Sequence, residues 1–161
     1  MLIQKIFHVR QSLDETQARL ENFHSYRRVF EGVNSSLHSE DGRARFQFVT
    51  GNGFRADIEL AQIQTDDAQQ TLYRSTDGNM DLVALVEYFP IREGLTEVQL
   101  TLDYSIHSHM YSVLDAVTAS VDRFINRHLR RLQMHLSGSG HSTSEYRFPA
   151  RDFGREPQLA H

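Results

Sequence analysis

His128 is the residue whose type and position could most readily do chemistry in this sequence. It lies near the centre of an apolar stripe on a helix predicted below, where a polar group is costly unless it is hydrogen-bonded. An imidazole titrates near neutral pH and can act as a general acid or base. Two interpretations stay open. One is a buried histidine satisfied by a backbone carbonyl or a nearby tyrosine, and the other is a polar group in a cavity that anchors a ligand or moves a proton.

Three further side chains could contribute to such a site. Tyr88 and Tyr104 lie on the apolar faces of predicted strands, where their hydroxyls could reach a ligand or belong to an amphipathic core. Arg74 alternates with Leu72 and Thr76 in another predicted strand. If that face points inward, Arg74 would anchor an anion or carboxylate. If it points outward, Arg74 is an ordinary exposed arginine.

Other kinds of catalytic or metal site find little support. The chain has no cysteine, which excludes thiol nucleophiles, disulfides and thiolate metal ligands. His107 and His109 lie at a predicted junction without the acidic neighbours that a metal site would need. Residues 51–53 are glycine-rich but precede a strand, so they do not predict a phosphate loop, and Asp66 and Asp67 fit a solvated turn. We therefore expect no metal and no cofactor, and we assign no catalytic residue.

Length, composition and charge narrow the class of protein. The 161 residues fit one ordinary domain, and 39% hydrophobic with 24% charged residues excludes a wholly disordered chain. No apolar run reaches the ~20 residues of a membrane helix, and the N-terminus lacks the pattern of a signal peptide. We therefore expect a cytoplasmic protein without stable membrane insertion. The net charge of −4 argues against nucleic acid as a partner.

The elements that must position these residues are mostly strands. Apolar and polar residues alternate with a period of two in one N-terminal segment and in six later segments separated by turn residues. Near-regular spacing and short turns predict that the six form an antiparallel meander. Pro90 should end the strand before it. The expected strands are 2–10, 33–39, 43–50, 54–63, 70–76, 80–89 and 95–106.

Three helices are expected. Ser12 and Glu15 match a capping box, which predicts a short helix to about Glu21, and a second short helix should cover 23–30. A helix of roughly 42 Å should cover 109–136, because apolar residues recur there at helical spacing. Its apolar stripe consists of Met110, Val113, Leu114, Val117, Val121, Phe124, Ile125, His128 and Leu132.

The last residues of the chain, 137–161, have a different composition. They begin with a Ser-Gly linker and contain two prolines, so we expect a flexible C-terminal tail after a domain of residues 1–136. The strand 80–89 is apolar on both faces, and one helix can cover only one of them. The aromatic residues of the tail, or a second copy of the chain in a homodimer, could cover the outer patch of Val83, Leu85 and Phe89.

The order of strand, two short helices, meander and long terminal helix resembles the START-like superfamily, also called SRPBCC or polyketide cyclase/dehydrase-like. The resemblance covers residues 2–136. Locally it rests on the stretches 7–15 and 26–33 and on the capped terminal helix. It implies a helix-grip fold of the α+β class, in which an antiparallel sheet wraps around the long C-terminal helix. Many members carry a tryptophan near the second short helix, and this chain has none.

Folds of this superfamily typically enclose a cavity between the sheet and the terminal helix. The resemblance therefore implies that this chain binds a small hydrophobic or aromatic molecule, such as a lipid or a polyketide-like or quinone-like compound. A cyclase or aromatase that uses His and Tyr as acid–base groups, and a protein-interaction module without a ligand, are the alternatives. We predict that the cavity is lined by Phe46, Phe48, Tyr88, Leu102, Tyr104, Val117, Val121, Phe124 and His128.

Overall fold

The computed structural model describes residues 1–21, 32–38, 43–107 and 111–137. Strands dominate, and the two described helices lie near the two ends of the described chain. In chain order the elements are β1 (Leu2–Val9), α1 (Leu13–Glu21), β2 (Val33–His38), β3 (Arg43–Val49), β4 (Arg55–Ile63), β5 (Gln70–Gly78), β6 (Met80–Arg92), β7 (Leu95–Ile106) and α2 (Tyr111–Ser137).

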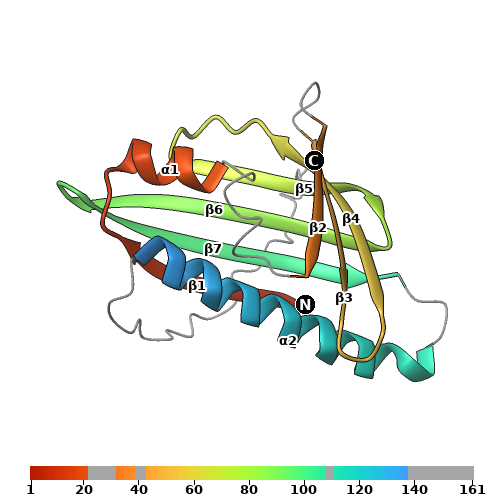
Figure 1. The fold of residues 1–161 in the computed structure, drawn as a ribbon. Coiled ribbons are helices and arrows are strands. Elements are labelled where there is room, and N and C mark those ends of the chain that lie inside the picture. The colour runs from red at the N-terminus through yellow and green to blue at the C-terminus, as the bar shows by residue number, and fades with distance from the viewer. Residues whose placement is uncertain (22–31, 39–42, 108–110, 138–161) are drawn as a thin grey trace, which may run out of the picture.

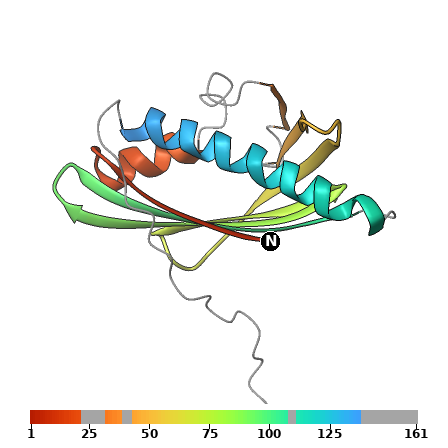
Figure 2. The same cartoon turned by 90° about the horizontal axis from the view of Figure 1, so that it is seen from below.

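The strands form one antiparallel sheet in the order β1-β7-β6-β5-β4-β3-β2. β1 therefore joins the meander by pairing with its last strand, Leu2 opposite Asp103 and Val9 opposite Thr96. Figures 1 and 2 show that the sheet is strongly curved, with β2, β3 and β4 standing at one end. Both helices lie on the concave side, and α2 runs along it. The helix-grip fold that the sequence predicted is confirmed.

The alternation of residue types decides which face of each strand is inside. In β7, Val98, Leu100, Leu102 and Tyr104 are buried, whereas the residues between them are partly or fully exposed. The apolar stripe of α2 meets this inner face, with buried residues at Val121, Leu132 and Leu136 and half-buried ones between them. The core of the domain is therefore the layer between the concave face of the sheet and α2.

The start of α1 is fixed by the predicted capping box. The Glu15 amide donates to Ser12 Oγ at 3.4 Å, and the Glu15 carboxylate accepts from the Ser12 amide at 3.1 Å. These reciprocal bonds satisfy polar groups that the first turn of a helix leaves without a partner. Towards its other end α1 meets α2, because Arg19 Nη2 donates to the carbonyl oxygen of His135 near the end of α2 at 3.1 Å.

A corner between β5 and β6 depends on two residues that are adjacent in the sequence. Gly78 has a φ of +119°, and a Cβ at this position would collide with the carbonyl oxygen of Asp57 in β4. Asn79 then continues the pairing with β4 through its side chain: its Oδ1 accepts from the Asp57 amide at 2.9 Å, and its Nδ2 donates to the Arg55 carbonyl at 2.7 Å. The connection between the predicted strands 70–76 and 80–89 is therefore a corner that is hydrogen-bonded to a neighbouring strand.

Pro90 does not end β6, contrary to the prediction. The strand continues to Arg92, and the register shifts between Pro90 and Arg92. Such an irregularity lets a strand contain a residue without an amide proton, because the ladder bond is interrupted there anyway. The expected helix 23–30, His109 and the tail 138–161 lie outside the described residues.

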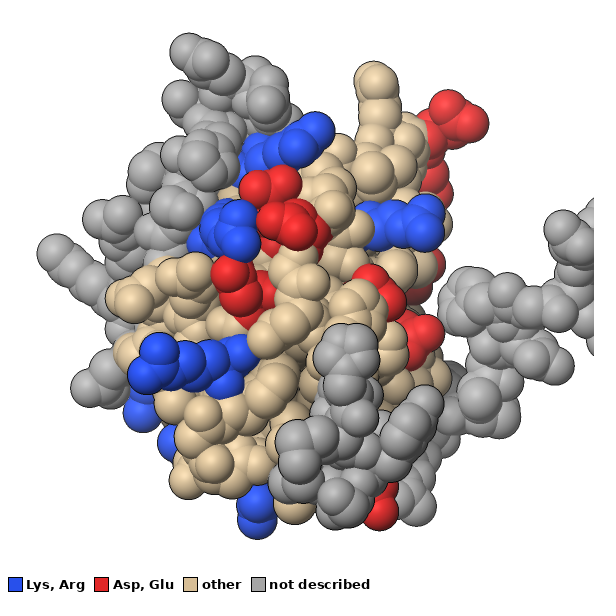
Figure 3. Space-filling model, turned by 90° about the vertical axis from the view of Figure 1, so that its right-hand side faces the viewer, with Lys and Arg blue, Asp and Glu red and all other residues tan. Residues whose placement is uncertain are grey.

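The outer face of β3 and β4 carries several charged side chains among uncharged ones (Figure 3). Arg45 binds Asp57 through two contacts of 2.8 Å, from Nε to Oδ1 and from Nη2 to Oδ2, and its Nη1 lies 3.4 Å from Asp77 Oδ2. Arg43 and Glu59 form a neighbouring pair at 3.4 Å. On the outer face of β6, Val83 and Phe89 are 39% and 38% exposed. What covers this patch stays a prediction.

Candidate functional site

A cavity of about 220 Å³ lies between the concave face of the sheet and α2. Side chains from β1, α1, β2 to β7 and the C-terminal half of α2 line it. Nearly all of them are apolar. Among the described residues of its wall, only Tyr73, Tyr88 and His128 contribute polar side-chain atoms. Protein interiors are otherwise packed with few voids larger than a water molecule, so this space is an unusual part of the fold.

Six of the nine predicted lining residues surround this cavity. They come from β3, β6, β7 and α2, elements that are far apart in the sequence. They are Phe46, Phe48, Tyr88, Leu102, Phe124 and His128. The period-two and helical patterns placed them on the correct faces, and the curvature of the sheet brings those faces together (Figure 1).

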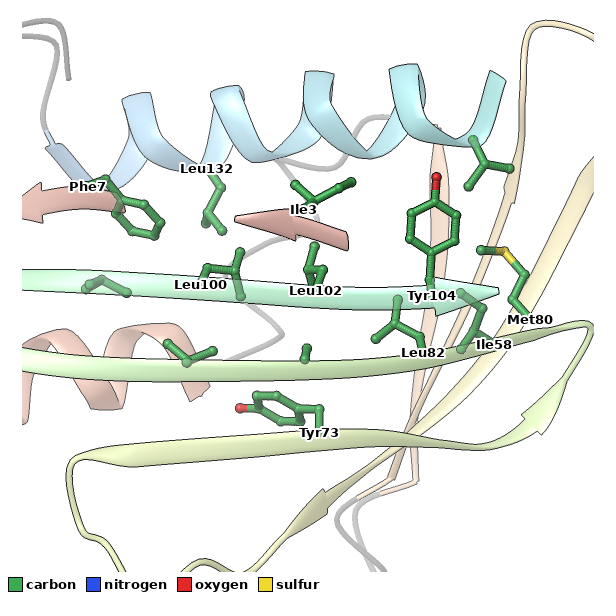
Figure 4. Packing of buried hydrophobic residues seen from close by; sticks show 14 of the residues in the cluster. Ile3, Phe7, Ile58, Tyr73, Met80, Leu82, Leu100, Leu102, Tyr104 and Leu132 are labelled. Carbon is green, nitrogen blue, oxygen red and sulfur yellow. The ribbon is translucent and has the colours of Figure 1, made fainter. Parts of the chain in front are cut away.

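Val117, Val121 and Tyr104 are the three predicted residues that do not line the cavity. Val121 and Tyr104 are buried and Val117 is half-buried, so all three belong to the core. The Tyr104 hydroxyl points toward α2 in the close view of Figure 4. The cavity lies opposite the C-terminal half of α2, from Phe124 to Leu132. Val117 and Val121 come earlier in α2 and pack in the core. The sequence pattern identified a continuous apolar stripe but not which part of it faces the cavity.

Tyr73 is a cavity residue that the sequence analysis missed. It is 7% exposed and lies on the inner face of β5, between that strand and β6 (Figure 4). Arg74, which could have been an inward anion anchor, is exposed on the outer face instead, opposite Val83 of β6. The signal was present in the alternation, because Thr71 and Tyr73 share one face of β5.

The other missed lining residues could have been found by extending the same alternation along strands already predicted. Most are aliphatic residues in phase with the predicted ones. They include Ile58, Leu60, Leu82, Ala84, Val86 and Leu100 from the sheet and Ile125, Leu129 and Leu132 from α2. Phe7, Leu20 and Val33 complete the wall from β1, α1 and β2.

Three rings form one wall of the cavity. Phe48 of β3 stacks on Phe124 of α2 with centroids 4.2 Å apart and an interplanar angle of 5°, and Phe124 stacks on His128 at 4.1 Å and 30°. Nδ1 of His128 lies 2.9 Å from the carbonyl oxygen of Phe124, so this nitrogen carries the proton and donates it. This bond agrees with the interpretation of His128 as a buried histidine satisfied by a backbone carbonyl.

Tyr88 of the cavity wall is joined to two polar side chains, Thr71 and Glu21, which do not line the cavity. Thr71 Oγ1 lies 3.1 Å from Glu21 Oε1 and 3.4 Å from the Tyr88 hydroxyl, and both Thr71 and Tyr88 are almost fully buried. Burial raises the pKa of Tyr88 to about 12, and it raises the pKa of Tyr73 well above its ordinary value. The negative charge of Glu21 acts in the same direction on both. Both phenols therefore stay neutral at physiological pH.

The described residues give no sign of metal chemistry or of a membrane span. No group of three or more His, Asp or Glu side chains in the described ranges could hold a metal ion. Within the same ranges, no helix is both long and apolar enough to cross a membrane. The arrangement is thus an apolar cavity with one aromatic wall, and the hydrogen-bonded cluster of Glu21, Thr71 and Tyr88 lies next to it.

Comparison of the sequence with protein-family models gives no match, and no curated protein matches it either. The structure, in contrast, resembles many solved structures. A protein of Thermus thermophilus, TTHA0849, superposes with a TM-score of 0.68 at 13% identity, over 84% of this chain and 97% of that one. A START superfamily protein of Mycobacterium smegmatis gives 0.63 at 12% identity, over 84% and 96%.

The Zhui aromatase/cyclase of Streptomyces sp. R1128 is also similar. Its TM-score is 0.65 at 13% identity, and the match covers 84% of this chain and 93% of that one. At identities this low the likeness establishes the fold and not the activity. The START-like fold that the order of elements implied is therefore confirmed.

Proposed function

We propose that this protein binds a small hydrophobic or aromatic molecule, of a lipid-like, polyketide-like or quinone-like kind, in the cavity between the sheet and α2. The observation that carries the proposal is the cavity itself, about 220 Å³ with an almost entirely apolar wall. The START-like fold supports it, because a START superfamily protein and an aromatase/cyclase have the same architecture.

The apolar wall of the cavity gives a ligand a source of binding free energy. Apolar surface that is removed from water contributes roughly 25 cal/mol per Å², and nearly all of this wall is apolar. A ligand that binds the folded state alone also stabilises that state by mass action.

The volume and the wall indicate a ligand of modest size. An apolar cavity of about 150 Å³ is enough to hold benzene. The larger space here suits a compound of about one or two fused rings or an equivalent aliphatic body. Because Phe124 is stacked between Phe48 and His128, its ring edge is what it can present to such a compound, and edge contacts favour aromatic ligands.

An enzyme of the cyclase or aromatase type is the second candidate. His128 in the cavity wall favours it, because its imidazole could move a proton at a bound ligand. However, its Nδ1 is bonded to the Phe124 carbonyl and its ring is stacked on Phe124. Acid–base catalysis would therefore depend on Nε2 alone. Binding without chemistry needs no such group and is the function that we prefer.

Filling the cavity tests the proposal. Ala84 lies on its floor in β6, and Ala84→Leu should place three extra carbon atoms in the space. We expect the wild type to bind naphthalene, a fluorescent apolar probe, and this variant to bind it about tenfold more weakly or not at all. Ala61→Leu, which makes the same change in β4 away from the cavity wall, is the control and should bind like the wild type.

Equal binding of naphthalene by Ala84→Leu and the wild type would contradict the proposal.

We also propose that residues 1–136 are sufficient for binding. The structure supports this boundary because Leu136, near the end of α2, is only 3% exposed and belongs to the core. A chain ending at Ser137 should therefore bind naphthalene as the full chain does.

A further inference from the structure

The outer face of the sheet, opposite the cavity and α2, carries a row of side chains that runs across the strands. Both described helices lie on the concave side, so neither covers this face (Figures 1 and 2). The registers of β4, β5, β6, β7 and β1 place one residue of each strand directly beside the next. In this order the charged row consists of Ala61, Arg74, Val83, Asp103 and Leu2.

The order of residue types in the charged row is self-complementary. Apolar residues stand at both ends and at Val83 in the middle, with Arg74 on one side of Val83 and Asp103 on the other. Both charged side chains are exposed, and Leu2 and Val83 are 47% and 39% exposed. Within the described residues Arg74 forms no ion pair, and Asp103 forms one exposed pair, at 3.5 Å, with the N-terminal ammonium. Reversing the row therefore exchanges cation and anion and keeps apolar residues in place.

The next row along the same strands carries no charge. It consists of Ile63, Leu72, Leu85, Thr101 and Gln4. Ile63 is 40% exposed, and Leu72 and Leu85 are half-buried. Apolar residues from three adjacent strands thus adjoin the charged row. Contiguous apolar surface of this kind, bordered by polar residues, is typical of surfaces through which proteins bind each other.

A second copy of the chain fits both rows. When two sheets pack face to face about a twofold axis along β6, β5 of one copy lies over β7 of the other. Arg74 of each copy then faces Asp103 of the other. Val83 meets its own counterpart, and Ala61 meets Leu2. An axis across the strands would instead place like charges against each other, so the charges select one orientation.

Two acidic residues of β6 lie on the same face, at either side of the two rows. Asp81 is hydrogen-bonded to His107 at 2.6 Å, and Glu87 lies two residues beyond Leu85. In a dimer about this axis each would approach its own counterpart. Aligned sheets cross at about 30°, so the ends of the two β6 strands diverge and these acids are kept apart.

We infer that the protein forms a twofold-symmetric homodimer through this face, in which Arg74 of each copy pairs with Asp103 of the other. The apolar residues of both rows supply most of the binding free energy, because exposed ion pairs contribute little. The two charges fix the orientation of the copies. This face lies on the opposite side of the sheet from the cavity, so the inference does not depend on the proposed function.

Charge reversal at the two positions tests the inference. Sedimentation velocity over a concentration series measures the dissociation constant of the wild-type dimer. Arg74→Asp places an acid opposite Asp103, and Asp103→Arg places an arginine opposite Arg74. Each variant alone should self-associate at least about tenfold more weakly than the wild type, because like charges meet twice in a symmetric dimer. An equimolar mixture of the two variants should dimerise as the wild type does, because every contact then joins an acid and an arginine.

Two controls separate this effect from net charge and from misfolding. Arg92→Asp makes the same change in net charge at the exposed end of β6, outside both rows, and should dimerise like the wild type. Both reversed variants should keep the circular-dichroism spectrum of the wild type. Recovery of the dimer in their mixture would itself show that each variant is folded.

Three outcomes would overturn the inference. One is a wild type that stays monomeric up to about 0.1 mM. Another is a mixture that associates as weakly as its two components, because the dimer would then not use the symmetric pairing. The third is a full chain that stays monomeric while a chain ending at Ser137 dimerises, because residues 138–161 would then occupy the face. Binding of naphthalene is measured separately, so none of these outcomes bears on the proposed function.

Discussion

The outer face of β3 and β4 and the inner face of the same sheet are stabilised in different ways. On the outer face Arg45 and Asp57 are each about a third exposed and joined by two contacts of 2.8 Å. On the inner face Tyr73 and Tyr88 are buried beside a cavity. Pairing holds the outer groups in their charged forms, whereas burial holds the inner ones in their neutral forms.

This difference shows in the pKa values. The Arg45 guanidinium, by its hydrogen bonds, holds the pKa of the Asp57 carboxyl below its usual value, and burial raises the pKa of Tyr88 to about 12. The two faces should therefore lose their stabilisation at opposite ends of the pH scale. A change that acts on one face should leave the response of the other unaltered.

The largest effect should be alkaline destabilisation from the inner face. Tyr88 titrates near 10 when unfolded and at about 12 when folded, so its contribution is complete below pH 10 and is lost as the pH rises from 10 to 12. For Tyr88 alone this loss is about 3 kcal/mol, and Tyr73 adds to it. Urea unfolding between pH 8 and 12 measures it. The Tyr88→Phe variant should lose less stability over this range than the wild type, and an identical loss would contradict the assignment.

Gly78→Ala, at the corner between β5 and β6, should be the most destabilising of the substitutions that act next to Asp57 on the outer face. A Cβ at φ +119° is strained and would collide with the Asp57 carbonyl, so we expect a loss of about 3 kcal/mol or more. Gly51→Ala is the control, because nothing lies within 4 Å of a Cβ at that position. Thermal unfolding of both variants gives the comparison. A melting temperature equal to that of the wild type in Gly78→Ala would show that the corner can rearrange freely.

Phe124→Ala and Phe89→Ala should compare the stability contributions of the inner and outer faces directly. The Phe124 ring is stacked between Phe48 and His128, so its loss should lower stability by about 2 kcal/mol and enlarge the cavity. Phe89→Ala removes the same ring from the outer face, where 38% is exposed, and should cost less than half as much. Urea unfolding of the two variants at pH 7 decides this. Equal losses would mean that the outer patch is itself covered.

The smallest effect should be the acid response of the outer face. The pKa of Asp57 is lowered on folding, so its stabilisation is present above its unfolded value near 4 and is lost as the pH falls below it. Asp57→Asn should flatten the fall in stability between pH 5 and 2, and Arg45→Met should do the same. The alkaline limb should not change in either variant. Urea unfolding across the acid range measures both, and a steeper acid limb in Asp57→Asn would contradict this origin.

The fold was predictable because local patterns specify it. Alternation in 95–106 and the helical stripe that includes Val121 determine which faces must be buried, and one arrangement of sheet and helix buries them all. The continuation of β6 past Pro90 was not predictable, because it depends on pairing with β7. The expectation that proline ends a strand takes account of one strand only, so it does not include a register shift that pairing with β7 stabilises.

The site was predictable in part. Phe48, Phe124 and His128 follow from the faces on which they lie, but their stacking requires that β3 and α2 meet at the end of a curved sheet. Tyr104 was predicted to line the cavity because sequence periodicity shows which residues face inward but not which part of the inner face borders the cavity. The link from Glu21 to Tyr88 through Thr71 joins three elements across 67 positions of the chain, and no local spacing indicates it.

The position of Tyr73 and Tyr88 in the cavity wall has an optical consequence. The chain has six tyrosines and no tryptophan, so its ultraviolet emission comes from tyrosine alone. Excitation energy passes from a tyrosine to a nearby aromatic acceptor with an efficiency that falls steeply with distance. An aromatic molecule that enters the cavity would therefore quench these two residues first and emit at its own longer wavelength. Tyrosine fluorescence therefore shows, without an added label, whether an aromatic molecule occupies the cavity.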